Sequence, residues 1–153
     1  MTFAFTVSAV IPASPEDIYD AWLDGRRHAA MTGSETATGS TRVGGKFTAW
    51  DGYIQGRNLA LDSGRRIVQS WRSSAFTDAD ADSQIEVTLA KTARGTRVTL
   101  RHSNVPDGHD GYREGWRDHY FEPMKAYFGK LAKARPAKGS AKKKLARGKA
   151  KKG

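Results

Sequence analysis

Residues 110–131 place large apolar side chains at the spacing of an amphipathic helix. An apolar residue recurs every three or four positions, which aligns these side chains along one face of such a helix. The resulting stripe consists of Tyr112, Trp116, Tyr120, Met124, Tyr127, Phe128 and Leu131. Pro123 lies inside the segment and predicts a kink, because proline has no N–H to donate and crowds the preceding turn. A helix with such a stripe needs an apolar surface to pack against, so the rest of the chain has to supply one.

The residues before this helix predict a series of short strands. Apolar and polar residues alternate in each run, and glycine-containing turns separate most of the runs. The predicted strands are residues 3–11, 46–50, 53–61, 65–73, 84–92 and 96–103. After the first strand, Ser14 can cap a helix that begins at Pro15, with Asp17 at the capping-box position. One further helical turn is predicted within residues 26–31.

The order of strand, helix, antiparallel strands and long helix predicts an α+β fold of the helix-grip type. In this arrangement a curved antiparallel sheet wraps around the long kinked C-terminal helix, and short helices follow the first strand. Successive side chains of a strand point to opposite faces of the sheet. The side chains predicted to face the helix are Ile67, Gln69, Trp71, Ile85, Val87, Leu89, Val98, Leu100 and His102.

Three stretches of the chain resemble a known family. GGKFTAWDGYIQGRNLAL, RRIVQSWRS and VPDGHDGYREGWRDHYFEPMKAYF are similar to the family of homologues of the activator of heat shock protein 90 ATPase. This family belongs to the START-like, birch-pollen-allergen-like superfamily, also called SRPBCC. The resemblance covers about residues 3–131, and it implies the helix-grip fold. The same scaffold serves lipid carriers, hormone receptors, cyclases and co-chaperone domains, so fold alone does not select among these functions.

The superfamily resemblance implies a ligand cavity between the sheet and the last helix. The side chains predicted to bind a ligand there are Trp22, Phe47, Gln69, Trp71, His102, Trp116, Tyr120 and Met124. Among them Gln69, His102 and Tyr120 would be the polar contacts of a mostly apolar ligand, which is the usual composition of such pockets. An aromatic stripe can also form solid core, and the interior volume distinguishes the two hypotheses.

Three functions are compatible with this pattern. The leading hypothesis is a small protein that binds a hydrophobic small molecule or lipid in the cavity. The second is a co-chaperone-like interaction module with a chaperone partner. The third is an enzyme of the cyclase or dehydratase type, with His102 and His119 as general acid and base, since histidine titrates near neutral pH. Both histidines could instead be structural, because neither belongs to a recognised catalytic or metal motif.

Other classes of site lack the residues that they need. The chain has no cysteine, which excludes disulfides and thiolate metal sites. Its four histidines form no HExxH motif and no pair at helical spacing, so we predict neither a metal nor a cofactor. Residues 39–47 have the glycine spacing of a phosphate-binding loop, but Gly45 stands where the Lys is required and Phe47 rather than Ser or Thr follows Lys46. No run of about 18 apolar residues and no signal-peptide pattern is present, so we expect no membrane span and a cytoplasmic location.

Basic residues are concentrated at the C-terminal end. The net charge is +10, yet eleven of the 26 Lys and Arg and none of the 16 Asp and Glu follow residue 129, so residues 1–129 carry a net charge of −1. We therefore predict a folded domain at residues 1–132 and a disordered Lys/Ala-rich tail at residues 133–153. The tail could bind nucleic acid non-specifically through phosphate contacts, or act only as a solubilising extension. Its candidate contacts are Lys142, Lys143, Lys144, Arg147, Lys149, Lys151 and Lys152.

Deleting residues 136–153 tests this division of the chain. We expect the truncated protein to keep its melting temperature, because the deleted segment has too few apolar residues to bury. We also expect it to lose any retention on double-stranded DNA at moderate salt, because most of the excess positive charge is removed. Circular dichroism melts and electrophoretic shift assays, with the full chain as control, measure the two effects. Tight DNA binding by the truncated protein would place the binding surface elsewhere.

Overall fold

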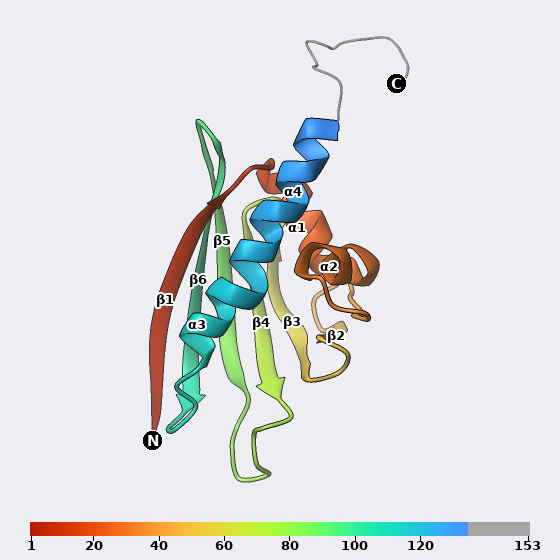
Figure 1. Cartoon of the computed structure of the whole chain (residues 1–153). Coiled ribbons are helices and arrows are strands. Elements are labelled where there is room, and N and C mark those ends of the chain that lie inside the picture. Colours follow the sequence, from red (N-terminus) through yellow and green to blue (C-terminus); the bar gives the residue numbers. More distant parts are fainter. Residues whose placement is uncertain (135–153) are drawn as a thin grey trace.

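The computed structural model describes residues 1–134, which form one antiparallel sheet with helices packed on one face (Figure 1). All neighbouring strands run antiparallel. Their order across the sheet is β1 (Thr2–Ile11), β6 (Gly95–Pro106), β5 (Ser83–Thr92), β4 (Arg66–Ser73), β3 (Ile54–Asp62) and β2 (Lys46–Ala49). The predicted α+β helix-grip fold is therefore confirmed.

The first strand forms one edge of the sheet by pairing with the last strand. Strands β2 to β6 follow one another as a meander, and β1 lies against β6 at the far edge. Two strands carry a register shift, between Phe3 and Phe5 in β1 and between Asn58 and Ala60 in β3. Such bulges bend a strand and increase its twist, which helps the sheet to curve around the helix.

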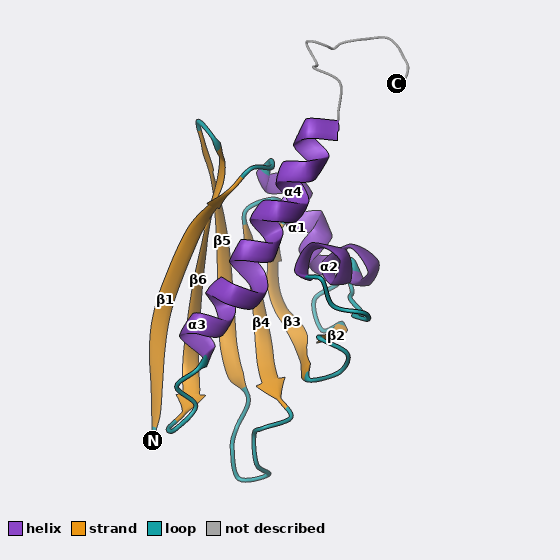
Figure 2. Cartoon of the chain, viewed as in Figure 1, coloured by secondary structure: helices purple, strands orange, loops and turns teal. Residues whose placement is uncertain are grey.

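Two short helices follow β1; the Ser14 cap predicted the first, and the second extends the single helical turn predicted within residues 26–31. In α1 (Pro15–Leu23), the Ser14 hydroxyl accepts a hydrogen bond from the Asp17 N–H at 3.1 Å. In α2 (Gly25–Thr32), the Asp24 carboxylate accepts from the Arg27 N–H at 3.2 Å. Helix α2 contacts both α4 and β2. The short helices therefore extend the helical layer on the same side of the sheet (Figure 2).

The C-terminal helix has three consecutive segments, which are α3 (Tyr112–Trp116), η1 (Arg117–Phe121) and α4 (Glu122–Ala134). The middle segment is π-helical, and the Glu122 N–H donates to the Arg117 carbonyl, one residue further back than in an α-helix. Pro123 follows immediately and has no N–H to donate, so the wider turn is tolerated there at little cost in hydrogen bonding. The irregularity predicted at Pro123 thus takes the form of a π-helical segment just before it.

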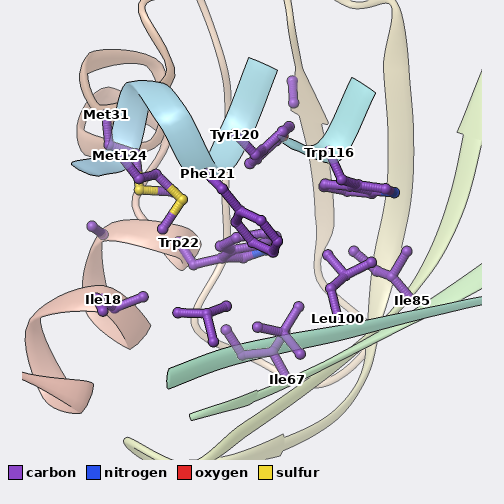
Figure 3. Packing of buried hydrophobic residues seen from close by; sticks show 14 of the residues in the cluster. Ile18, Trp22, Met31, Ile67, Ile85, Leu100, Trp116, Tyr120, Phe121 and Met124 are labelled. Carbon is purple, nitrogen blue, oxygen red and sulfur yellow. The ribbon is translucent and has the colours of Figure 1, made fainter. Parts of the chain in front are cut away.

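The core lies between the helix stripe and the inward rows of the sheet. All nine side chains predicted to face the helix from the three central strands are buried, while Arg66 and Arg101 on the opposite face are exposed. Figure 3 shows the sheet residues Ile67 and Leu100 below the helix, with Phe121 packed over Trp22. Strand alternation and helix periodicity therefore gave the correct buried faces of both layers.

Two predictions concern the ends of the described region. The expected boundary between residues 132 and 133 falls near the end of α4, and the tail contacts at residues 142–152 lie outside the described residues, so both remain predictions. Within residues 1–134, no helix has the length and apolar character that crossing a membrane would require.

Two glycines offer a matched test of the packing. Gly56 in β3 faces Phe47, and a Cβ atom there would collide with the Ser70 carbonyl oxygen and approach the Phe47 ring at 2.8 Å. We expect Gly56→Ala to lower the free energy of unfolding by about 2 kcal/mol or more, as overpacking does. In contrast, a Cβ at Gly115 in α3 meets no atom within 4 Å. Gly115→Ala should therefore stabilise the protein, by up to about 1 kcal/mol.

Urea unfolding of the two variants beside the parent measures both changes. A loss of stability in Gly115→Ala would contradict the open surroundings of that residue. Unchanged stability in Gly56→Ala would contradict the close approach of β2, β3 and β4.

Candidate functional site

A hollow of about 570 Å³ lies between the beginning of the C-terminal helix and one end of the sheet. This volume is in the range of roughly 300–1,000 Å³ that small-molecule sites occupy. The sheet side consists of the β2–β3 connection, the start of β3 and the end of β4, and its lining residues are Trp50, Tyr53, Ile54 and Trp71. The helix side is residues 111–120, and its lining residues are Gly111, Tyr112, Glu114, Gly115, Trp116, Asp118, His119 and Tyr120.

The structure divides the eight predicted ligand-binding residues into two groups. Trp71, Trp116 and Tyr120 line the hollow. The other five are buried in the core and do not line it, and these are Trp22, Phe47, Gln69, His102 and Met124. The eight side chains therefore lie in one contiguous interior, but only three of them border the hollow.

Several lining residues were not among the predicted ones. Tyr112 belongs to the helix stripe, so its periodicity could have identified it. Trp50, Tyr53 and Glu114 all lie in stretches that carry the family resemblance, but no pattern of their own marked them as lining residues. The residues of the connection are placed by backbone geometry, which alternation does not reveal.

Gln69 belongs to a chain of hydrogen bonds inside the core. The Trp22 indole N–H donates to Gln69 Oε1 at 3.2 Å, and Gln69 Nε2 donates to Asn58 Oδ1 at 2.9 Å. Asn58 Nδ2 in turn donates to the carbonyls of Ser40 and Arg42 at 2.8 and 2.9 Å. The chain ties the loop before β2 to the core. The Gln69 amide is thus paired with protein atoms on both sides.

His102 has both ring nitrogens engaged in the core. The Trp116 indole N–H donates to Nδ1 at 3.1 Å, which places the ring proton on Nε2. Nε2 then donates to Ser83 Oγ at 2.9 Å, and Ser83 Oγ donates to the Trp71 carbonyl at 2.6 Å. Burial lowers the pKa of His102 from 6.5 to about 3. The imidazole is therefore neutral near pH 7, and neither nitrogen is available to a ligand or a substrate.

His28 makes the equivalent connection to Tyr120. Nδ1 donates to the Trp22 carbonyl at 2.8 Å, since a carbonyl only accepts, and Nε2 therefore accepts from the Tyr120 hydroxyl at 2.7 Å. Burial lowers the pKa of His28 to about 4, although the hydrogen bond to Trp22 acts in the opposite direction. Burial also raises the pKa of Tyr120. Sequence reasoning did not identify His28, because it lies in the weakly patterned segment 24–39.

The remaining polar groups lie around the rim of the hollow. The Tyr112 hydroxyl is 2.7 Å from Ser73 Oγ and 3.1 Å from His109 Nδ1, and burial is the main cause of its raised pKa. His119, the second acid–base candidate, is exposed, and its ring lies nearly perpendicular to the Trp50 ring with centroids 5.6 Å apart. Within residues 1–134, no three His, Asp or Glu side chains gather in a way that could hold a metal ion.

Trp50 combines two unfavourable features at the wall of the hollow. Its φ of 51° is in the left-handed region, which bulky residues seldom adopt, and the following Asp51 has a φ of 61°. Its indole N–H is buried and has no hydrogen-bond partner within the described residues. A buried unpaired donor costs about 1–3 kcal/mol. The turn itself is held in place because Asp51 Oδ1 accepts from the N–H and the hydroxyl of Thr36, at 2.7 and 3.1 Å.

Comparison with known proteins gives a consistent result. The family model for Activator of Hsp90 ATPase homolog 1-like protein matches residues 12–129. An "Activator of 90 kDa heat shock protein ATPase homolog" from Dictyostelium discoideum is 31% identical over 122 residues, which is 78% of this chain and 31% of the relative. The human "Activator of 90 kDa heat shock protein ATPase homolog 1" is 26% identical over 129 residues, 84% of this chain and 38% of the relative. The chain thus spans about a third of the length of these curated relatives.

A solved structure shares the fold. The crystal structure of an HSP90 activator from Plasmodium falciparum superposes with a TM-score of 0.74 at 20% identity, and the match covers 83% of this chain and 96% of the other. The sheet order, the helix layer and the family match over residues 12–129 agree, and the chain belongs to the Activator of Hsp90 ATPase homolog 1-like family.

Proposed function

We propose that the hollow binds an apolar small molecule that carries a hydrogen-bond acceptor. The observation that carries this proposal is Trp50, whose buried N–H lacks a partner within residues 1–134 while its ring lines the hollow. Backbone strain and unpaired polar groups tend to collect at functional sites, and an acceptor on a ligand would remove the second of these costs. The ligand needs to be mainly apolar because most of the lining side chains are aromatic.

The pairing of the other polar groups supports the same conclusion. Gln69 and His102, the predicted polar contacts, are hydrogen-bonded to protein atoms on both sides. The Tyr120 hydroxyl donates to His28. The inner wall would therefore present rings rather than free polar groups to a ligand. The polar side chains that remain at the lining besides Trp50, namely Glu114, Asp118 and His119, lie on the exposed helix side.

The enzyme hypothesis receives less support from this geometry. A general acid and base need to reach the reacting atoms, and His102 lies outside the lining with both nitrogens engaged. His119 does line the hollow, yet no hydrogen bond to another side chain orients it within the described part of the chain. Binding without catalysis is the function that these two positions favour.

A second proposal follows from the names of the relatives. Because they are described as activators of the 90 kDa heat shock protein ATPase, this domain is also a candidate to contact that chaperone through its outer surface. Val43 and Leu59 are apolar and 64% and 46% exposed. They are neighbours, since backbone hydrogen bonds of 2.7 and 2.9 Å join Gly44 and Gly45 to Asn58. Direct binding to the purified chaperone, with Val43 and Leu59 replaced by Ser, separates this proposal from the first.

The substitution Trp50→Phe tests the ligand proposal with two matched probes. One is 2-acetylnaphthalene, whose carbonyl can accept a hydrogen bond, and the other is 2-ethylnaphthalene, which has a similar shape and no acceptor. We expect Trp50→Phe to weaken binding of the acetyl probe by about three- to tenfold, the worth of one neutral hydrogen bond, and to leave the ethyl probe unchanged. Stability should not fall, because the variant removes an unpaired donor. Nuclear magnetic resonance titrations, followed at the amides of Gly111 and Gly115, measure both affinities.

Trp22→Phe is the control for this experiment. Trp22 lies outside the lining and donates to Gln69, so its replacement should lower stability without changing the ratio of the two affinities. If neither probe binds the parent protein, the proposal is refuted. Equal losses for both probes in Trp50→Phe would refute the role of the indole N–H.

The two buried histidines predict how stability depends on pH. The unfolded chain protonates each near pH 6.5, whereas the folded protein resists protonation down to about pH 4 at His28 and about pH 3 at His102. The free energy of unfolding should therefore be at its full value above pH 6.5 and fall as the pH decreases towards 4. Each histidine contributes up to about 1.4 kcal/mol per pH unit in that window.

Urea unfolding at pH 7, 6 and 5 measures this slope. His119→Gln is the matched control, because His119 is exposed and should leave the slope unchanged. His28→Gln should remove the contribution of one histidine to the slope, which is up to about 1.4 kcal/mol per pH unit. A parent protein equally stable at pH 7 and pH 5 would contradict the neutral, buried state of both rings.

A further inference from the structure

The charged groups that line the hollow are carboxylates. Glu114 and Asp118 are both lining residues on the helix side, and no Lys or Arg lines the hollow within residues 1–134. Pockets that hold anionic head groups commonly supply Lys, Arg or free backbone N–H groups to them. This hollow offers an anion no such side chain, and its two carboxylates would repel it.

The two carboxylates have little compensation from the protein. Glu114 forms no ion pair within the described residues. Asp118 pairs with the adjacent Arg117 at 3.2 Å, but both side chains are more than half exposed, and such pairs contribute little. Glu114 and Asp118 are four residues apart on one helix, a spacing at which like charges destabilise each other. A positive charge beside them would relieve that repulsion.

The amino end of the helix does not reverse this preference. Helix α3 begins at Tyr112, and a helix N-terminus carries a partial positive charge of about +0.5. Glu114 lies in the first turn and places a full negative charge at the same end. The full charge of Glu114 exceeds the partial charge of the helix end, so this end of the helix does not by itself form a site for an anion.

The walls add a second feature that favours cations. Six of the lining residues are Trp or Tyr, and they are Trp50, Tyr53, Trp71, Tyr112, Trp116 and Tyr120. The face of an aromatic ring attracts a cation, most strongly for Trp and for cations that are weakly hydrated, such as quaternary ammonium groups. Aromatic walls with carboxylates at the rim and no competing Lys or Arg are the composition that recognises organic cations.

We propose that the hollow selects an apolar molecule with a positively charged head group over neutral or anionic molecules of the same shape. This inference rests on the proposed ligand-binding function and adds the charge class of the ligand. The apolar part would lie against Trp71, Trp116 and Tyr120, and the cation would lie near Glu114 and Asp118. The lining excludes fatty acids and other anionic lipids from the preferred ligands.

Three probes of nearly identical shape test the charge preference. They are (naphthalen-2-ylmethyl)trimethylammonium, 2-neopentylnaphthalene and naphthalen-2-ylmethanesulfonate, with charges of +1, 0 and −1. Their dissociation constants are measured by nuclear magnetic resonance titration of the parent protein and of the double variant Glu114→Gln/Asp118→Asn. We expect the double variant to lose about tenfold in affinity for the ammonium probe, to keep its affinity for the neutral probe and to gain affinity for the sulfonate.

Glu16→Gln/Glu122→Gln is the matched control, because it removes the same charge from exposed residues that do not line the hollow. It should leave the ratios among the three probes unchanged. An equal loss for the ammonium probe in both double variants would overturn the inference, since the effect would then come from net charge. Unchanged ammonium affinity in Glu114→Gln/Asp118→Asn would also overturn it. If none of the three probes binds the parent while 2-acetylnaphthalene does, this inference is overturned and the proposed function stands. If 2-acetylnaphthalene also fails to bind, the proposed function itself is refuted.

Discussion

Two hydrogen bonds to neutral imidazoles hold the C-terminal helix against the rest of the protein. Trp116 donates to His102 on the sheet, and Tyr120 donates to His28 on α2, so one helix face is fixed to two different elements. Each bond requires an unprotonated acceptor nitrogen, which burial ensures by lowering both histidine pKa values. The π-helical segment between Trp116 and Pro123 widens the turn that carries Tyr120. Hydrogen bonding, burial and helix irregularity therefore act together on four side chains, which are His28, His102, Trp116 and Tyr120.

The same rings belong to the core and to the hollow. Trp116 is 3% exposed, its ring lies 4.6 Å from Tyr120 and 5.9 Å from Trp71, and all three border the open volume. Their position is set by the core, so the inner wall of the hollow is formed before any ligand arrives. The outer wall, at Trp50, does not depend on the core in this way. Trp50 is held by a strained turn that Asp51 and Thr36 stabilise, and its unpaired N–H contributes nothing to folding. A preformed aromatic wall facing one free donor is an arrangement suited to binding.

The sequence predicted which side chains face the core better than it predicted which of them border the open space of the hollow. Alternation in β4, β5 and β6 identified the inward residues, and the Ser14 cap and the stripe from Tyr112 onwards located the helices, because each of these patterns follows from local geometry. Periodicity does not distinguish a ring that borders an open volume from one that is packed on every side. Met124 has the same helical spacing as Trp116 and Tyr120, yet it lies in the core and does not line the hollow. The left-handed backbone at Trp50 and the contact between His28 and Tyr120, 92 residues apart, depend on tertiary structure.

The position of the hollow determines which part of the helix a ligand can influence. The lining residues of the helix run from Gly111 to Tyr120, through α3 and most of η1. Helix α4 instead contacts α2 and β1, away from the hollow. A bound ligand would add contacts to the first half of the helix, which begins at Tyr112 and whose N-cap residue, Gly111, has no side chain to cap it. Because the π-helical segment separates the two halves, stabilisation of α3 by a ligand need not be transmitted to α4. The outer surface at Val43 and Leu59, on the loop before β2 and on β3, is likewise separate from the lining, so the proposed ligand site and the proposed chaperone contact occupy different parts of the domain.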